Sequence, residues 1–176
     1  MMSPLARTLA STLAAFAVVG ALVGCARSPE PTPTPTGFAS EAEAFEAAEA
    51  TYRAYVDALN EVDLSDPETF EPVFALTTGD SLANEKTTLT RMHADGWEVS
   101  GATTISEIRG SSWSADIIEI QVCSNVSAVD VRDSSGNSVV PTNRPDEYSL
   151  SVILEGTSSE NLLIASSDTE ASEICD

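Results

Sequence analysis

Basic residues are scarce in this chain. Its 176 residues include only eight Lys and Arg, against 28 Asp and Glu, which gives a formal net charge of −20. Proteins that bind the phosphate backbone of nucleic acids need clusters of Lys and Arg. The composition therefore excludes nucleic-acid binding and argues against docking on anionic lipid headgroups. It predicts an acidic, soluble surface whose copies repel one another.

Histidine occurs once, as His93, which limits the catalytic chemistry that we can assign. Residues 79–82 (GDSL) spell the nucleophile block of the GDSL esterases and lipases, but that family pairs its serine with a histidine near the C-terminus. A serine without an adjacent base is a weak nucleophile, and on one helix Ser81 and His93 would lie ~18 Å apart. We interpret the four letters as a helix boundary, with Gly79 closing one helix and Asp80 capping the next. No catalytic residue is assigned.

The apolar run near the N-terminus is shorter than a membrane-spanning helix. It extends over 16 uncharged residues from Leu9 to Gly24, whereas a helix needs ~20 to cross a bilayer. With Arg7 before it, the run has the layout of a secretory signal.

The last letters of this run, residues 22–25 (LVGC), resemble the lipobox of bacterial lipoproteins, in which small residues precede a cysteine that receives a diacylglyceryl group. The resemblance implies cleavage after residue 24, a lipidated Cys25 and anchoring on the extracytoplasmic face of the cell membrane, since two acyl chains suffice for stable attachment. The alternative is an ordinary signal peptide, or a short anchor helix, with an incidental cysteine.

Four prolines alternate with Thr and Glu in residues 26–37. Such a run forms neither a helix nor a sheet ladder, and favours an extended tether; a ligand for a proline-binding partner is the alternative. Three segments are therefore predicted: a signal peptide over 1–24, the lipidated cysteine with its tether over 25–37, and one domain over 38–176. Beyond residue 24 there are seven basic and 28 acidic residues.

Cysteine occurs three times. With Cys25 lipidated, Cys123 and Cys175 remain as a pair in an oxidising compartment, where a disulfide is expected. Two free thiols or a metal pair are the alternatives, but a zinc site needs four ligands and no histidine is close in sequence. We expect no metal and no cofactor.

Helical signals fill the first half of the predicted domain. Ser40 and Glu43 form a capping box, and apolar residues follow at helical spacing to about residue 61. These residues are Phe45, Ala48, Tyr52, Tyr55, Val56 and Leu59. A second, short helix is predicted from Asp66-Pro67-Glu68 to near Thr78-Gly79, and a third from there to Asp95-Gly96.

After Gly96 the apolar spacing changes to two, which is typical of strands. Strands are predicted over 97–105, 113–126, 148–154 and 162–165, with a hairpin around Asp133–Gly136. Helices followed by strands predict an α+β fold, in which three N-terminal helices pack on a curved, mainly antiparallel sheet of four to six strands.

Three features carry a resemblance to a known family: this order of elements behind a lipobox, Trp97 at the start of the sheet, and the spaced Cys123 and Cys175. In these features the chain resembles the small actinobacterial lipoproteins of unknown function with an NTF2-like (cystatin-like α+β) domain. The resemblance covers residues 38–176 and implies a cone-shaped concavity. The side chains that it suggests as a possible pocket lining are Tyr52, Tyr55, Trp97 and Trp113.

Three functions are compatible with these features. The leading hypothesis is a non-catalytic binding or accessory module tethered to the membrane through Cys25, with a protein or small molecule as its partner. The first alternative is a small-molecule hydrolase or isomerase with a site in the sheet concavity, and the second is a structural envelope spacer. An enzyme requires a pocket in which two polar groups lie in mutual reach, whereas a spacer requires none.

Overall fold

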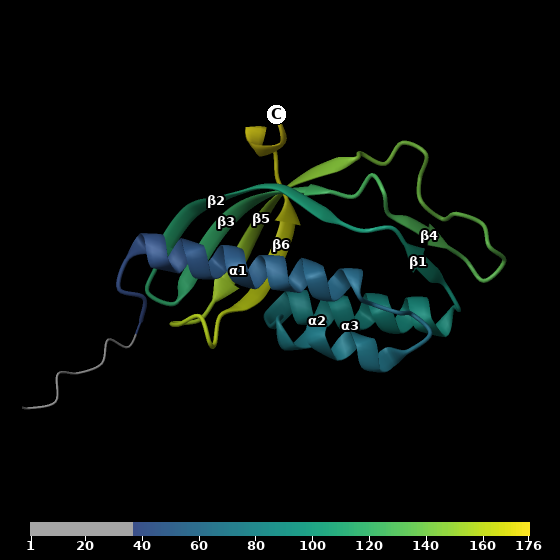
Figure 1. Cartoon of the computed structure of the whole chain (residues 1–176), viewed down its shortest axis with the longest axis horizontal. Coiled ribbons are helices and arrows are strands. Elements are labelled where there is room, and N and C mark those ends of the chain that lie inside the picture. Colours follow the sequence, from purple (N-terminus) through teal and green to yellow (C-terminus); the bar gives the residue numbers. More distant parts are fainter. Residues whose placement is uncertain (1–36) are drawn as a thin grey trace, which may run out of the picture. The chain divides into compact units, whose positions relative to one another are not determined.

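The computed structural model describes residues 37–176 (Figure 1). The predicted signal peptide, Cys25 and nearly all of the tether lie outside the described residues. The helices are α1 (Glu41–Asn60), the 3₁₀ helix η1 (Pro67–Phe70), α2 (Glu71–Ala75), α3 (Gly79–Ala94) and the 3₁₀ helix η2 (Glu173–Cys175). The strands are β1 (Glu98–Ser100), β2 (Thr104–Ser114), β3 (Ile117–Asn125), β4 (Asp130–Arg132), β5 (Glu147–Glu155) and β6 (Leu163–Thr169).

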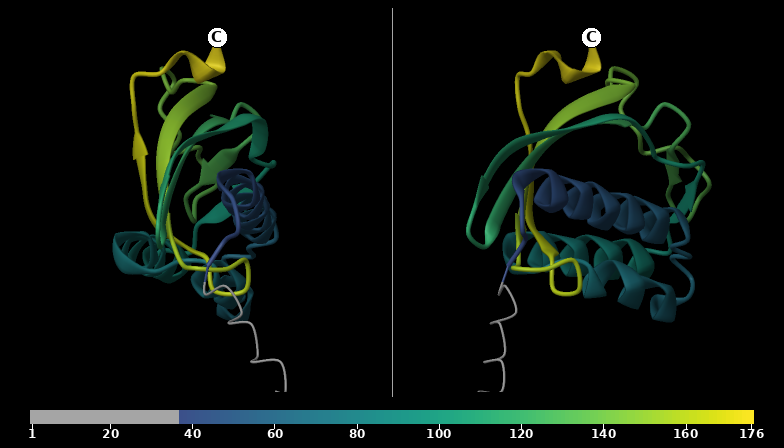
Figure 2. Two further views of the ribbon diagram at one scale, coloured as in Figure 1. Left: turned by 90° about the vertical axis from the view of Figure 1, so that its left-hand side faces the viewer. Right: turned by 60° about the vertical axis from the view of Figure 1, so that its left-hand side comes forward.

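The main sheet has four antiparallel strands in the order β2-β3-β5-β6, while β1 and β4 form a separate antiparallel pair. Figure 2 shows the main sheet curving over α1, with η2 on the far side of the sheet from that helix. Helix α3 contacts β6 at the edge of the sheet. The predicted α+β class, with three helices packed on a mainly antiparallel sheet, is confirmed.

The core lies between α1 and the concave face of the sheet. Ile118 and Ile120 of β3 stand opposite Leu154 and Val152 of β5, and all four side chains are fully buried. Their spacing of two places them on one face of the sheet. Helix α1 covers this face with residues spaced three and four apart. These residues are Ala44, Ala48, Thr51, Tyr52, Tyr55 and Val56.

A capping side chain is present at the start of α1 but not at the starts of α2 and α3. The predicted cap of α1 is present, since the Glu43 N–H donates to Ser40 Oγ over 3.2 Å. The prediction that Gly79 closes a helix and Asp80 caps the next is wrong: α2 ends at Ala75, and the N-cap of α3 is Thr78. The Thr78 N–H donates to the Ile164 carbonyl, so a contact with β6 sets this boundary rather than a capping side chain.

The predicted run over 113–126 is divided by a turn. Ser114 pairs with Ile117, which leaves Ala115 and Asp116 as a two-residue hairpin loop between β2 and β3. Ala115 adopts φ +51°, a conformation that such loops normally give to Gly, Asn or Asp. Because alanine carries no turn signal, the sequence does not reveal the hairpin. The predicted strand over 97–105 is likewise two strands, β1 and β2.

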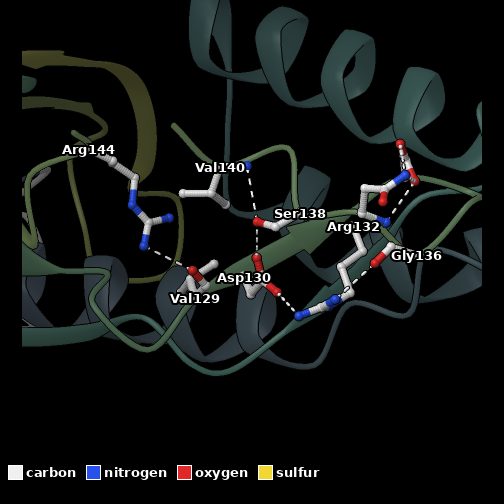
Figure 3. Close-up of polar contacts among 9 residues, drawn as sticks. Val129, Asp130, Arg132, Gly136, Ser138, Val140 and Arg144 are labelled. Atoms are coloured by element: carbon white, nitrogen blue, oxygen red, sulfur yellow. Dashed lines mark hydrogen bonds and ion pairs between the residues drawn. The ribbon is translucent and has the colours of Figure 1, made fainter. Parts of the chain in front are cut away.

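The predicted hairpin around Asp133–Gly136 is present, with a bridge between Arg132 and Ser138. Polar contacts stabilise it (Figure 3). Arg132 forms an ion pair with Asp130 at 2.8 Å and donates to the Gly136 carbonyl, while Ser138 donates to Asp130.

The predicted disulfide between Cys123 and Cys175 is confirmed, with 5.2 Å between the two Cα atoms. It joins η2 to β3 on the outer face of the main sheet, where Ile174 is also buried. The C-terminal tail is thereby attached to the strand that holds Cys123, as expected. Among residues 37–176, no helix has both the length and the apolar character that crossing a membrane requires.

Candidate functional site

A cavity of about 410 Å³ lies where α1, the first turns of α3 and strand β6 meet. Helix α1 contributes Tyr55, and α3 contributes Asp80, Ser81, Asn84 and Glu85. The lining is completed on β6 by Ser166, Ser167 and Asp168. We call this space the Glu85 cavity. Its lining is almost entirely polar, in contrast to the adjoining core.

Local structure explains how these side chains meet. Ser81 and Glu85 are four residues apart on α3 and therefore project from the same face of the helix. On β6 the pairing changes register, because Leu154 pairs with Ile164 but Val152 pairs with Ser167. Val152 and Leu154 both face α1, so this irregularity brings Ser167 to the same side of the sheet.

Glu85 and Tyr55 are joined by a hydrogen bond. The Tyr55 hydroxyl donates to Glu85 Oε1 over 2.5 Å, and the Tyr55 ring lies 5.8 Å from the ring of the buried Tyr52. Burial raises the pKa of Glu85, and the bond from Tyr55 opposes this shift only partly. Burial, with the negative charge of Glu85, raises the pKa of Tyr52 to about 12 and also raises the pKa of Tyr55. Both tyrosines therefore keep their protons at neutral pH.

No basic side chain lines the Glu85 cavity. Within the described part of the chain, the ion pairs join Arg53 to Glu49, Arg109 to Glu107 and Arg132 to Asp130. Lys86 follows Glu85 in sequence, but its Nζ lies 5.5 Å from the centre of the Phe74 ring instead. Residues 37–176 thus supply no ion-pair partner to the three carboxyl groups of the cavity.

Ser81 is buried but unbonded. Its side chain is 8% exposed and lines the cavity, and its hydroxyl has no hydrogen-bond partner among residues 37–176. His93 lies near the other end of α3, where its Nδ1 is 2.7 Å from the Leu64 carbonyl oxygen and so donates to it. The GDSL letters therefore do not bring a serine and a histidine base together.

A second cavity, of about 570 Å³, lies between the loop after α1, the end of α3 and strand β1. Its lining includes Asp63, His93, Trp97, Glu98 and Val99. His93 already bonds a backbone carbonyl, and both His93 and Val99 are exposed. We therefore consider the Glu85 cavity, with its mostly buried serine and its partly buried carboxyl group, the better candidate for a specific site.

The four aromatic residues suggested as a pocket lining are not brought together. Tyr55 lines the Glu85 cavity, and Tyr52 packs beside it in the core at 3% exposure. Trp97 lines the second cavity. Trp113 packs against the core from β2, and its indole N–H is the one buried side-chain group without a partner in the part of the chain that the structure describes.

Sequence reasoning missed Glu85. Its position is three residues after Leu82, four before Leu89 and seven before Met92, so it falls on the face of α3 that is otherwise apolar. The sequence signal that could have identified Glu85 is a single carboxyl group on an apolar helix face.

One group of three potential metal ligands is found among residues 37–176, consisting of Cys123, Glu147 and Cys175. Its two sulfur atoms are joined in the disulfide. Thiolates, not disulfide sulfurs, are the usual protein ligands, so this group is not a metal centre in its oxidised form.

Comparison with known proteins identifies the fold. No protein-family model and no curated relative matches this sequence. A protein from Novosphingobium aromaticivorans assigned as an aromatic ring hydroxylase is 11% identical, with a TM-score of 0.54 over 74% of this chain and 90% of that one. The intermembrane space region of the chloroplast protein ARC6 is 14% identical, with a TM-score of 0.52 over 73% of this chain and 97% of that one.

At these identities the comparison shows the fold alone. The chain has an NTF2-like α+β fold, as the resemblance implies. The resemblance to actinobacterial lipoproteins remains a prediction.

Proposed function

We propose that this protein is a non-catalytic binding module, held on the extracytoplasmic face of the cell membrane by a lipid on Cys25, and that a small polar molecule occupies the Glu85 cavity. The fold supports a site in this position, because the cavity lies beside the core where α1, α3 and the edge strand β6 meet. The tether is supported by the lipobox-like residues 22–25.

Unused hydrogen-bonding capacity in the Glu85 cavity carries this proposal. The Ser81 hydroxyl has no hydrogen-bond partner among residues 37–176, although the residue is only 8% exposed, and Glu85 receives one hydrogen bond from the described residues, from Tyr55. Buried polar groups cost free energy unless they are bonded. A polar ligand would supply the missing partners.

The arrangement of groups favours binding over catalysis. A serine nucleophile needs a base within reach, and His93 is at the other end of α3. General acid–base catalysis works best with a pKa near the working pH, whereas Tyr55 holds its proton far above neutral pH.

The raised pKa of Glu85 favours one second candidate, a small-molecule hydrolase or isomerase in which this carboxyl carries a proton. Turnover of a bound compound, abolished in Glu85→Gln, would establish that alternative. A compound recovered unchanged after prolonged incubation with the protein supports the binding module.

A thermal-shift screen of small polar molecules against the detergent-purified full chain tests the binding proposal. Ligands should raise the melting temperature of the wild type but not of Ser81→Leu, which removes the hydroxyl and places a larger apolar side chain in the cavity wall. Thr90→Leu, on the exposed side of α3, is the matched control and should keep the response. A screen without a cavity-dependent ligand would favour the envelope spacer.

The tether is tested separately. In cells, Cys25→Ser should move the protein from the membrane fraction to the soluble fraction. Mass spectrometry of the wild-type N-terminus should find a chain that begins at a diacylated Cys25. Retention of residues 1–24, or an unmodified Cys25, would disprove the anchor.

A further inference from the structure

We propose that the ligand of the Glu85 cavity is a small organic cation with a primary ammonium group, and that Glu85 is its counter-ion. This inference rests on the proposed function and names the class of molecule that the cavity accepts. It is argued from the charge, the unfilled acceptors and the size of the cavity.

The charge of the cavity selects a cation. Three carboxyl groups line it, Asp80 and Glu85 from α3 and Asp168 from β6, and none of them is ion-paired among the described residues. The N-terminus of α3 carries a partial positive charge that would favour an anion. Asp80 lies in the first turn of that helix and offsets this charge.

The unfilled acceptors select a cation with N–H groups. Tyr55 donates to Glu85 Oε1, which leaves Glu85 Oε2 without a partner in the described part of the chain. The Ser81 hydroxyl lines the cavity and makes no hydrogen bond to residues 37–176, so it is also free to accept one. A primary ammonium has three donors and no acceptor, as in the lysine side chain, and so complements this lining. A quaternary ammonium would leave the acceptors unfilled.

The spacing of the carboxyl groups argues against a single metal ion. Calcium needs six to eight oxygen ligands within ~2.6 Å. Among residues 37–176, the acids of this cavity do not come close enough together to form a three-ligand cluster. At about 410 Å³ the cavity also exceeds what one ion would fill. An organic cation that reaches from Glu85 toward Asp168 fits the space better.

Isothermal titration of the detergent-purified full chain with 1,4-diaminobutane tests the inference, with 1,4-butanediol as the uncharged molecule of similar length. Physiological ionic strength suppresses long-range attraction to the acidic surface. We expect the diamine to bind at least tenfold more tightly than the diol. Equal binding of the two would overturn the inference, as would calcium that binds in place of the diamine and displaces it.

Variants locate the charge that is responsible. Glu85→Gln keeps an acceptor for Tyr55 but removes the charge, and should weaken diamine binding at least tenfold. Asp168→Asn, on the exposed part of β6, should also weaken diamine binding. This variant tests the site even if Glu85→Gln folds poorly. Glu46→Gln, exposed on α1, removes the same charge elsewhere and should change nothing. An equal loss in Glu46→Gln would mean diffuse attraction and would refute the site.

The pH dependence provides a third measurement. The ionisable groups that face Glu85 are Tyr52 and Tyr55 on α1, Asp80 on its own helix and Asp168 on β6. The tyrosines stay protonated while Glu85 loses its proton as the pH rises, so diamine affinity should rise with pH in the wild type and rise less in Glu85→Gln. An unchanged rise in Glu85→Gln would count against Glu85 as the counter-ion.

The failures of the two proposals are distinguishable. If the diamine does not bind but an uncharged compound binds in a manner that Ser81→Leu abolishes, the binding module stands and the cationic ligand is wrong. If no compound depends on the cavity, both proposals fail.

Discussion

Glu85 is a carboxyl group on the inward face of a helix, and among residues 37–176 it has one hydrogen-bond donor and no basic partner. Its pKa in the folded state is raised above its ordinary value of 4.5 by burial. A raised pKa means that the folded state binds the proton more tightly than the unfolded state does. Proton binding by Glu85 therefore stabilises the folded state. This stabilisation is fully present when the pH is below the ordinary pKa, and it is lost as the pH rises through the folded-state pKa.

Glu85→Gln should therefore remove part of the pH dependence of folding. At acidic pH the variant should match the wild type in stability, and near neutral pH it should equal or exceed it, because the amide bears no charge to bury. Melting temperatures measured between about pH 4 and pH 8 check this. The exposed Glu46→Gln serves as control and should retain the wild-type slope, whereas an unchanged slope in Glu85→Gln would contradict the burial argument.

Tyr55 provides the complementary test at the same site. Tyr55→Phe keeps the ring in the core but removes the donor to the partly buried Glu85, and loss of a hydrogen bond to a carboxyl group of this kind costs about 1–3 kcal/mol. Urea unfolding at neutral pH measures this cost. Tyr52→Phe is the matched control, because its hydroxyl makes no hydrogen bond among the described residues, and its effect should be smaller. Equal losses in the two variants would assign the effect to packing instead.

At the scale of elements, the pair β1–β4 depends on a close backbone approach. Gly101 follows β1 with φ +78°, and a Cβ at this position would lie 1.9 Å from the Ala128 carbonyl oxygen. Gly136, in the hairpin after β4, has a similar φ of +81° but no atom within 4 Å of such a Cβ. The two glycines share the backbone conformation and differ in the space around them.

Alanine substitutions separate these two effects. Gly136→Ala should cost about 1–2 kcal/mol, the usual strain of a left-handed non-glycine residue. Gly101→Ala should cost at least about 3 kcal/mol, since strain and backbone overlap add. The midpoints of urea unfolding compare the two directly. Similar costs would mean that the chain at Ala128 moves aside easily.

The elements that the sequence predicts best are those with local signals. Helix α1 is recognisable from its capping box and apolar spacing, and the turn around Asp133–Gly136 from its composition. The hairpin at Ala115 is not, because alanine in a left-handed conformation carries no turn signal. The boundary at Thr78 is also hidden, since a backbone bond to Ile164 fixes it.

The Glu85 cavity is hidden for a different reason. It joins residues near positions 55, 81–85 and 166–168, and nothing in a single sequence aligns segments so far apart. The register change between β5 and β6 that turns Ser167 toward α1 is likewise a property of strand pairing. Sequence could identify one aromatic liner, Tyr55, and could have flagged Glu85 as a charge on an apolar face.

For the whole molecule, the large negative charge and the disulfide have separate consequences. The net charge of −20 favours the approach of cations and keeps copies of the protein apart. The disulfide closes a loop of 52 residues between Cys123 and Cys175. It lies on the face of the sheet opposite α1, away from the Glu85 cavity, so stability and ligand binding should respond differently to its loss.

Removal of the disulfide tests this separation. Cys123→Ala with Cys175→Ala should lower the free energy of unfolding by up to about 4 kcal/mol, because the unfolded chain regains the entropy of the open loop. The double variant is preferable to a single one, which would leave a free thiol. Urea unfolding measures the loss, and a reductant should reproduce it in the wild type but have no effect on the variant.

Ligand affinity in the Glu85 cavity should stay within about twofold of the wild-type value at urea concentrations below the unfolding transition, since α1, α3 and β6 are held by the core and not by the tail. A variant of undiminished stability would show that Ile174 and the hydrogen bonds of residues 170–172 hold the tail without the covalent bond.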